Sequence, residues 1–449
     1  TTLAAVSYRR LLAGIRALPG VTGSHVRFLV CQTGRRVLTF GSMKEFFKVV
    51  DLEEARARAC EFAVLPAERI PIAAGNGRVL AADLVAEVDL PGFRRSTMDG
   101  YAVCASSTFG ASDSAPALLT VVGSVPMGAS SELSVVPGQA ARILTGGMVP
   151  PGANAVVMVE HTEPIDETTI EVTRSVAPQQ NVIEPADDTR RGDTLVERGT
   201  RLRPPEIGLL AALGRSSVDV FVRPVVAIIS TGDEIVPIDV SPAPGQIRDV
   251  NSHTLSAMVE AAGGTPRPLG IVGDDFDALA ARCRAALVEA NTVVLSGGSS
   301  VGSRDLTLAV LEALPDSRVC LHGVAIKPGK PTILADVGGK AFWGLPGHVA
   351  SAMVVFHVLV RRHLEHIAGV KPRPEIRVPA RLSRNIASVH GRRELVRVRL
   401  EHRDGQLWAV PVPGKSGLIR TMVEADAYVE ICRDAEGLEQ GTEVLVHQM

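Results

Sequence analysis

Aromatic residues, net charge and long apolar runs are all scarce in this chain of 449 residues, and these scarcities limit the kinds of protein it can be. Aromatic residues make up only 4% of the sequence, so aliphatic side chains and alanine must fill the cores. The formal net charge is −2, whereas a dedicated nucleic-acid-binding protein usually carries a strong basic surplus. No apolar run approaches the ~20 residues that a membrane-spanning helix needs. We therefore expect a globular protein that binds neither nucleic acid nor a membrane.

Cysteine pairs at metal-binding or redox spacing are also missing. The six cysteines are scattered along the chain, and no two of them form a CxxC pair. This distribution is typical of a reduced protein without a disulfide framework or a structural zinc site. We therefore expect a cytoplasmic location.

Acidic residues are missing from residues 1–42, which contain six arginines. Such a composition can belong to an organelle transit peptide. However, Gly41-Ser42-Met43 resembles a cloning junction in front of a natural start. We therefore interpret residues 1–42 as a leader or an expression-derived extension and leave them out of the functional argument.

The length of the chain predicts about three domains at ~150 residues each. The pattern of apolar and turn-forming residues changes along the chain in agreement with this number. Within residues 43–222, a helix is expected at 51–64, with Asp51 as its N-cap. Short Val/Leu/Ile runs between Gly/Pro turns follow and predict small β-rich units. A short helix is expected to begin after Arg203 and to end at Gly214.

Residues 223–370 alternate between strand-like and helix-like segments, which predicts a doubly wound, mostly parallel α/β domain. Such sheets bind ligands at the carboxyl ends of their strands. After a proline-rich joint, residues 371–449 read as short strands and predict a small all-β module. The α/β strands are expected at residues 225–230, 269–272, 292–295, 332–334 and 342–345, and the helices at 253–262, 276–289, 305–314 and 351–367.

A glycine-rich loop follows the strand at 292–295 and precedes a helix. Glycines let the backbone approach a ligand, and the free N–H groups at a helix start favour a phosphate or pyrophosphate. The loop is not a GxGxxG fingerprint, and it could equally be a tight turn without a ligand. Its candidate binding residues are Ser296, Gly297, Gly298, Ser300 and Gly302.

Acidic residues follow the ends of several predicted strands. Carboxylates gathered at one edge of a sheet repel one another unless cations neutralise them, and oxygen ligands of this kind suit Mg²⁺ shared with a phosphate. Alternatively, each acid is only a helix N-cap or a turn residue. The acids are those of Thr231-Gly232-Asp233-Glu234, Asp249, Asp274, Asp275 and Asp305.

Two basic side chains lie in the stiff loop Lys327-Pro328-Gly329-Lys330-Pro331, and like charges held together favour an anion. Gly414-Lys415-Ser416 resembles the end of a phosphate-binding loop, but position 409 is alanine, so we reject that interpretation. His348 lies in a strand-to-helix turn and is either a ligand contact or an ordinary loop residue. The histidines at 357, 363 and 366 do not have the HExxH spacing, and we expect them at the surface or at an interface.

Eight segments, in their order along residues 43–449, resemble the molybdopterin molybdenumtransferase family of molybdenum cofactor biosynthesis, of the MoeA or gephyrin E-domain type. They are LPGFRRSTMDGYAV, RILTGGMVPPGANAVVMVE, DDTRRGD, STGDE, GQIRDVNSHTL, SGGSSVGSRD, KPGKP and GLPG.

The resemblance implies a multidomain α/β and β architecture. Elongated and β-rich N-terminal domains precede a molybdopterin-binding α/β domain, and a small β-barrel-like domain ends the chain. It also implies a homodimer whose active site combines the α/β domain of one subunit with the N-terminal domains of the other. The expected protein partners are a molybdopterin adenylyltransferase and the apo-molybdoenzymes that receive the cofactor.

The resemblance further implies an enzyme that transfers molybdenum from molybdate to adenylyl-molybdopterin and releases AMP. The pyrophosphate would bind near residues 296–302 together with Thr231 and Gly232, and Mg²⁺ would bind Asp274 and Asp305. Molybdate would bind Lys327, Lys330, Pro331, Arg392 and Ser416. Asp99, Asp188, Glu234 and Asp305 match acidic positions that are important for catalysis in the family.

Three positions depart from the family pattern near this expected site. Ser299 stands where valine is usual, Gly323 where some members have lysine, and His348 where asparagine is usual. A tungstate-preferring homologue and a non-catalytic molybdopterin-binding scaffold are the alternatives to the transferase. A stand-alone molybdopterin adenylyltransferase is disfavoured, because such a protein would lack the N-terminal and C-terminal segments.

Overall fold

A computed structural model describes residues 49–297 and 301–449. The predicted extension, residues 1–42, lies outside these described residues, as do the side chains of residues 301–305. Within the described residues, no helix is long and apolar enough to cross a membrane.

The first described helix, α2 (Leu52–Ala59), begins as predicted but ends earlier than the expected residue 64. Asp51 caps it by accepting a hydrogen bond from the Glu54 N–H at 2.8 Å. Beyond the helix, the backbone bonds to another segment instead: the Phe62 carbonyl lies 2.9 Å from His366 Nε2, and the Leu65 N–H donates to Ile367 O at 2.8 Å. These tertiary hydrogen bonds replace the helical ones and end the helix.

Two short antiparallel pairings and one helix form the first β-rich unit. Strand β1 (Ala67–Pro71) pairs with β12 (Ser217–Phe221), and β2 (Leu84–Val85) pairs with β11 (Thr194–Val196). Helix α3 (Pro204–Ala212) packs beside them, and its first turn is closed by the Glu206 carboxylate, which accepts from the Arg203 N–H at 2.7 Å. The helix expected between Arg203 and Gly214 is therefore confirmed.

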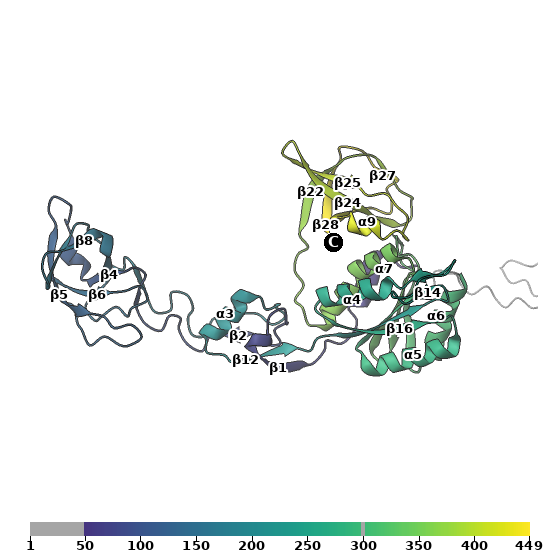
Figure 1. Cartoon of the computed structure of the whole chain (residues 1–449), viewed down its shortest axis with the longest axis horizontal. Helices are drawn as coiled ribbons and strands as arrows, with labels where there is room; N and C mark the ends of the chain where they lie inside the picture. Colours follow the sequence, from purple (N-terminus) through teal and green to yellow (C-terminus); the bar gives the residue numbers. More distant parts are fainter. Residues whose placement is uncertain (1–48, 298–300) are drawn as a thin grey trace, which may run out of the picture. The chain divides into compact units, whose positions relative to one another are not determined.

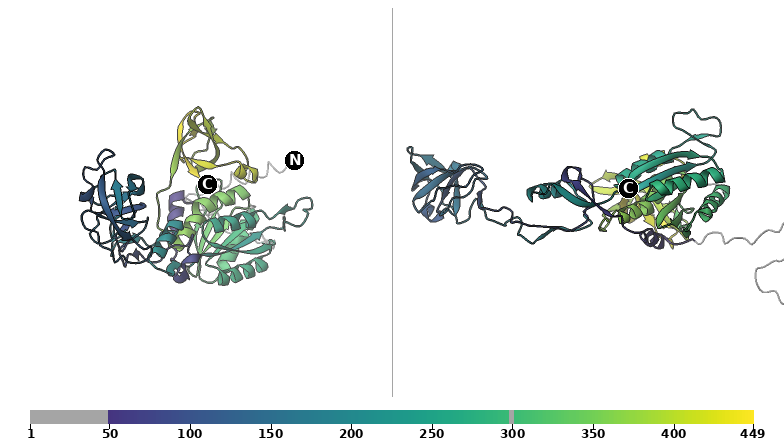
Figure 2. Two further views of the ribbon diagram at one scale, coloured as in Figure 1. Left: turned by 60° about the vertical axis from the view of Figure 1, so that its left-hand side comes forward. Right: turned by 90° about the horizontal axis from the view of Figure 1, so that it is seen from below.

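A six-stranded sheet forms the second β-rich unit, in the order β7-β4-β6-β5-β9-β8. Two chain segments lead into it and out of it, and they pair through β3 (Arg95–Ser96) and β10 (Val182–Ile183). Figure 2 draws this unit in dark blue in both views, as a β module of its own. Its strands are β4 (Gly100–Val103), β5 (Ala117–Ser124), β6 (Gln139–Ile143), β7 (Ala155–Met158), β8 (Thr162–Pro164) and β9 (Thr169–Val172).

The α/β domain contains a second six-stranded sheet, in the order β16-β13-β17-β21-β20-β18. The pairings from β16 to β21 are parallel, as predicted, whereas β20 and β18 extend the sheet antiparallel. Strand β18 had not been predicted. The strands are β13 (Val225–Thr231), β16 (Thr265–Val272), β17 (Thr292–Gly297), β18 (Ser317–His322), β20 (Ile333–Val337) and β21 (Lys340–Leu345).

Helices cover both faces of this sheet (Figure 1), which makes the fold the predicted doubly wound one. Alternate residues of a strand face opposite sides: Ile228 packs into the core under α4 and α7, and Ile229 packs into the core under α5 and α6. The helices are α4 (Asn251–Ala261), α5 (Phe276–Glu289), α6 (Val301–Ala313) and α7 (Val349–Val355).

The long helix expected at 351–367 is interrupted. It consists of α7, a π-helical turn (Phe356–Val360) and α8 (Arg361–Ile367). His357, His363 and His366 were expected at the surface or at an interface, and His363 is not at the surface, because it is only 1% exposed. Its two ring nitrogens lie 2.9 Å from Thr292 Oγ1 and 3.0 Å from Ala59 O, so it joins α2 to the sheet.

The C-terminal strands form a third sheet, in the order β19-β24-β25-β22-β28-β26, and an additional β24–β26 pairing closes it into a barrel. Strand β19 (Ile326–Lys327) comes from the α/β segment and pairs with the start of β24. This register joins the basic loop after β19 to the barrel. The barrel strands are β22 (Arg377–Leu382), β24 (Arg393–Arg403), β25 (Gln406–Pro411), β26 (Ala427–Ile431) and β28 (Glu443–Gln448).

Candidate functional site

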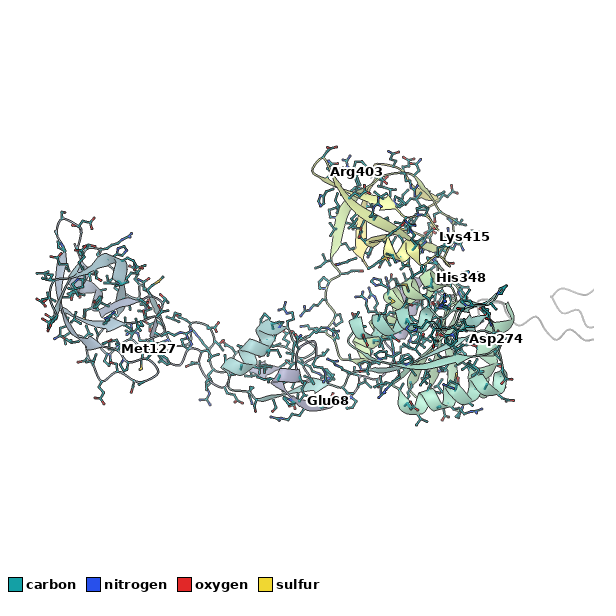
Figure 3. All side chains as sticks on the ribbon, viewed as in Figure 1. Glu68, Met127, Asp274, His348, Arg403 and Lys415 are labelled. Carbon is teal, nitrogen blue, oxygen red and sulfur yellow. The ribbon has the colours of Figure 1, made fainter. Side chains whose placement is uncertain are left out.

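An acidic group lies at the carboxyl end of β13 and β16. The sheet register places Thr231 opposite Val272 and Gly297, so the ends of three parallel strands meet. Asp274, labelled in Figure 3, follows β16: its N–H donates to Asp233 Oδ1 at 3.0 Å, and Thr231 Oγ1 donates to its carboxylate at 3.3 Å. Partial burial, followed by the charges of Asp233 and Glu234, raises the pKa of Asp274. These carboxylates therefore repel one another.

Two of the other predicted acids accept hydrogen bonds that stabilise the local structure. Asp249 is buried and accepts hydrogen bonds from Ser230 Oγ at 2.9 Å and from the Ser252 N–H at 3.1 Å. Asp275 is the N-cap of α5 and accepts from the Ala278 N–H at 2.8 Å. The acidic edge thus consists of Asp233, Glu234 and Asp274.

The acidic edge fits a cation that a substrate shares with the protein. Burial, and then repulsion from Asp233 and Glu234, raises the pKa of Asp274, and a divalent cation would relieve the repulsion. In the part of the chain that the structure describes, no three His, Cys, Asp or Glu side chains converge at metal-ligand spacing. Because Mg²⁺ is commonly bound through one or two carboxylates plus phosphate oxygens, this sparse donor set suits it.

The glycine loop begins where β17 ends. A side chain at Gly297 would place its Cβ 2.0 Å from the Thr231 carbonyl oxygen, and φ is +147°, so the position requires glycine. Ser296 is buried and its hydroxyl accepts a hydrogen bond from Asn251 Nδ2 at 2.7 Å. The predicted residues Gly298 and Ser300 lie outside the described residues.

Gly302 and Asp305 belong to helix α6, and the side chain of Asp305 lies outside the described part of the structure. Sequence analysis had not assigned a role to Asn251. Its amide also donates to the Gly347 carbonyl at 2.8 Å, so it ties the end of β17 to the turn after β21.

A cavity of about 740 Å³ lies between the α/β segment and the barrel. A neighbouring cavity of about 10 Å³, lined by Gly297, shares Pro331 and Pro346 with it. The end of β17 therefore lies beside residues that also line the larger cavity. The larger cavity is lined by residues 326–331, Pro346, His348, Ser351, Ile386, Arg392, residues 394–397 and residues 412–416.

Cationic side chains dominate this cavity. All five residues predicted for molybdate line it: Lys327, Lys330, Pro331, Arg392 and Ser416. Arg397, Lys415 and His348 also line it. The sequence left His348 open as a ligand contact and gave Arg397 and Lys415 no place in this site. An arginine inside the apolar run of a strand was the available signal for Arg397.

Among the side chains that the structure describes, one carboxylate lines the cavity, and it already accepts two hydrogen bonds. Glu394 accepts hydrogen bonds from Lys327 Nζ at 2.7 Å and from Ser388 Oγ at 2.8 Å. By contrast, the Nε atoms of Arg392 and Arg397 are buried and have no hydrogen-bond partner among the described residues. Burial lowers the pKa of Arg397. Buried guanidinium N–H groups without acceptors, in a cavity with a cationic surplus, are suited to an anion.

The predicted acids of the N-terminal region lie in exposed segments. Asp99 accepts from both the N–H and the hydroxyl of Thr145, each at 2.7 Å, and these hydrogen bonds lower the pKa of Asp99. Asp188 is exposed, and its N–H donates to the Leu90 carbonyl at 3.1 Å. Neither residue lines the 740 Å³ cavity. The loop that precedes Asp99 exposes Phe93 by 43%.

The fold and these sites define a multidomain α/β protein with a cavity that several cationic side chains line. Three family profiles account for nearly all of the described chain: MoeA N-terminal region (domain I and II) at residues 50–214, probable molybdopterin binding domain at 227–366, and MoeA C-terminal region (domain IV) at 379–449. The chain belongs to the MoeA family.

Curated relatives agree with this assignment. The chain is 32% identical to a molybdopterin molybdenumtransferase of Bacillus subtilis over 402 residues, which is 88% of this chain and 93% of the relative. It is 33% identical to a putative molybdopterin biosynthesis protein of Methanocaldococcus jannaschii over 388 residues, which is 85% of this chain and 92% of the relative.

Solved structures have the same fold. The molybdopterin biosynthesis moeA protein from Pyrococcus horikoshii is 32% identical, with a TM-score of 0.77, and the match covers 90% of this chain and 100% of that chain. A second Pyrococcus moeA structure is 38% identical, with a TM-score of 0.75, over 89% of this chain and 99% of that chain.

Proposed function

We propose that this protein is a molybdopterin molybdenumtransferase. It transfers molybdenum from molybdate to adenylyl-molybdopterin and releases AMP, which yields the molybdenum cofactor. Relatives named for this activity match most of the chain, and a probable molybdopterin binding domain matches residues 227–366.

The observation that carries the proposal is the surplus of cationic over acidic side chains that line the 740 Å³ cavity, together with the buried Nε atoms of Arg392 and Arg397, which have no hydrogen-bond partner among the described residues. Molybdate is a compact dianion, and charge-assisted hydrogen bonds to guanidinium and ammonium groups hold such an ion strongly. In the proposal, Lys327, Lys330 and Arg392 supply these bonds and Ser416 adds its hydroxyl. Pro331 stiffens the loop that carries the two lysines.

The adenylyl end of the substrate is proposed to bind next to this cavity. Residues 296–302, together with Thr231 and Gly232, cradle the pyrophosphate at the strand ends. Asp274 and Asp305 hold Mg²⁺, which neutralises phosphate charge when it is bound. The pKa of Asp274, which burial and then the neighbouring carboxylates raise, supports this role.

The remaining catalytic assignments rest on the family resemblance. Asp99, Asp188 and Glu234 are proposed to act in catalysis, with the first two supplied to the site by a second subunit of a homodimer. A cytoplasmic location, and encounters with a molybdopterin adenylyltransferase and with apo-molybdoenzymes, belong to the same proposal. A monomer in light scattering at the assay concentration would refute the shared site.

The direct test is AMP release from adenylyl-molybdopterin with Mg²⁺ and with molybdate, tungstate or neither. Release that depends on molybdate is expected. Stronger dependence on tungstate would identify a tungstate-preferring homologue. No release from a folded dimer that still binds molybdopterin would refute the transferase and indicate a binding scaffold.

A further inference from the structure

The turn after β21 brings a histidine to the cationic cavity. His348 precedes helix α7 and occupies its N-cap position, but its side chain makes no capping hydrogen bond. Instead, His348 Nδ1 lies 2.8 Å from Ser416 Oγ, while the Ala350 N–H donates to the Ser416 carbonyl at 3.0 Å. The start of α7 and the loop after β25 are therefore joined by two hydrogen bonds at one residue.

Either His348 Nδ1 or Ser416 Oγ can be the donor of the hydrogen bond between them. The two cases have opposite consequences for an anion in the cavity. When Nδ1 carries a hydrogen, the imidazole donates to Oγ and the serine hydrogen is free to donate to a ligand in the cavity. When Nδ1 carries none, Ser416 donates to the ring and presents only lone pairs to the ligand. A protonated imidazole has hydrogens on both nitrogens and therefore permits only the first arrangement.

We propose that His348 is a positioning residue that directs the Ser416 hydroxyl toward a tetrahedral oxyanion and makes oxyanion affinity increase as pH falls. Protonation fixes the useful direction of the hydrogen bond and adds a positive charge to the cavity. The inference rests on the proposed function only for the identity of the oxyanion, because the geometry itself does not involve molybdopterin. It gives a role to one of the departures from the family pattern.

The other charged groups around His348 do not titrate in the same range. The neighbouring loop supplies Lys327 and Lys330, and Lys415 precedes Ser416. The start of β24 supplies Arg392, Glu394 and Arg397. Histidine is the residue type that ordinarily changes its charge between pH 6 and pH 8, whereas lysine, arginine and glutamate ordinarily do not.

Helix α4 contacts the same turn, because Asn251 donates to the Gly347 carbonyl at 2.8 Å. It carries one histidine, the exposed His253, which is not among the residues that line the cavity. Among the described residues that line the cavity, His348 is the histidine, so a change in oxyanion affinity over this pH range reports on it.

The test is calorimetric titration of the full chain with molybdate alone, and then with tungstate, at pH 6 and at pH 8. Both oxyanions stay dianionic over this range. The affinity of the unmodified protein is expected to be about tenfold higher at pH 6, which corresponds to converting one neutral hydrogen bond into a charge-assisted one. Equal affinity at both pH values would overturn the proposal.

Two variants separate positioning from a structural role. His348→Gln keeps an amide donor but cannot be protonated, so it is expected to bind molybdate with little pH dependence. His348→Ala is expected to bind more weakly at both pH values because the Ser416 hydroxyl loses its orientation. The matched control, His402→Gln, changes an exposed histidine of β24 and is expected to keep the full pH dependence. A His348→Gln protein with an unchanged pH profile would overturn the proposal.

The outcomes distinguish this inference from the proposed function. If the unmodified, folded protein binds neither oxyanion at either pH, the molybdate site itself is wrong. If it binds molybdate tightly and equally at both pH values, the molybdate site stands and only the role of His348 is lost. In a parallel measurement of AMP release, His348→Gln is expected to change the KM for molybdate at pH 6 with little change in kcat.

Discussion

Removing the side chain of Arg392 tests most directly whether the cavity binds an oxyanion. Arg392 lines the cavity from the barrel side, and its Nε is buried without a hydrogen-bond partner among the described residues. The Arg392→Ala change removes a donor that the folded protein does not use. We therefore expect a large loss of oxyanion affinity and little change in the midpoint of thermal unfolding.

The magnitude follows from the bonds that Arg392 can supply. A hydrogen bond to a charged group contributes ~1.5–3 kcal/mol, and a factor of ten in Kd corresponds to ~1.4 kcal/mol. The Kd for molybdate is therefore expected to increase roughly 10- to 150-fold. Arg392→Lys keeps the charge but loses the planar fork of donors, so its Kd is expected to lie between those of the unmodified protein and Arg392→Ala.

The assay is calorimetric titration with molybdate, alongside a thermal unfolding scan of each variant. Arg381→Ala is the matched control, because Arg381 is exposed on β22 of the same barrel and is not among the residues that line the cavity. It is expected to bind molybdate as the unmodified protein does. A folded Arg392→Ala protein with an unchanged Kd would refute the assignment of the cavity to the oxyanion.

Three further predictions follow from charged and buried groups. Asp274 has a raised pKa, so its ionised form destabilises the fold at pH 7, and without Mg²⁺ the Asp274→Asn change is expected to raise the midpoint of thermal unfolding. AMP release by this variant is expected to need at least about tenfold more Mg²⁺. Glu394→Gln removes a negative charge from the cavity and is expected to lower the Kd for molybdate several-fold, measured by calorimetry; a higher Kd would contradict this. Burial lowers the pKa of His363 to about 4, so the unfolded state binds more protons below pH 6.5 and the free energy of unfolding is expected to fall between pH 6.5 and pH 4, by up to ~3 kcal/mol. Urea denaturation of His363→Leu is expected to give a shallower pH dependence over that range.

The fold was predictable where the signals are local. Helix α5 occupies the expected residues 276–289, because Asp275 supplies an N-cap and the apolar spacing is regular. Strand β13 was recognised as a continuous apolar run. Strand β18 was missed because Arg318 and other polar residues occupy this edge strand and leave no regular alternation. The early end of α2 was missed because its competing hydrogen bonds are made to residues about three hundred positions away.

The candidate site likewise contains residues that local sequence predicts and residues that it does not. The loop from Lys327 to Pro331 contains two cations and two stiffening prolines within five positions, so its composition alone indicated an anion. Arg392 and Ser416 were identified only through the family resemblance, and the structure places them on the same cavity as that loop. Asp249, which resembled the other strand-end acids in sequence, is instead a buried acceptor for Ser230.

The role of a histidine is difficult to predict from its neighbours in sequence, because its chemistry depends on the atom next to each ring nitrogen. His363 and His348 are both polar residues in apolar stretches, and neither stretch distinguishes them. The ring of His363 donates to the Ala59 carbonyl, 304 positions earlier, and His348 faces a hydroxyl 68 positions later. A partner at either distance leaves no periodic signal around the histidine. The role of each ring therefore follows from the packing of whole domains, which is why His348 became a candidate for oxyanion binding only after the barrel and the α/β segment were seen to share one cavity.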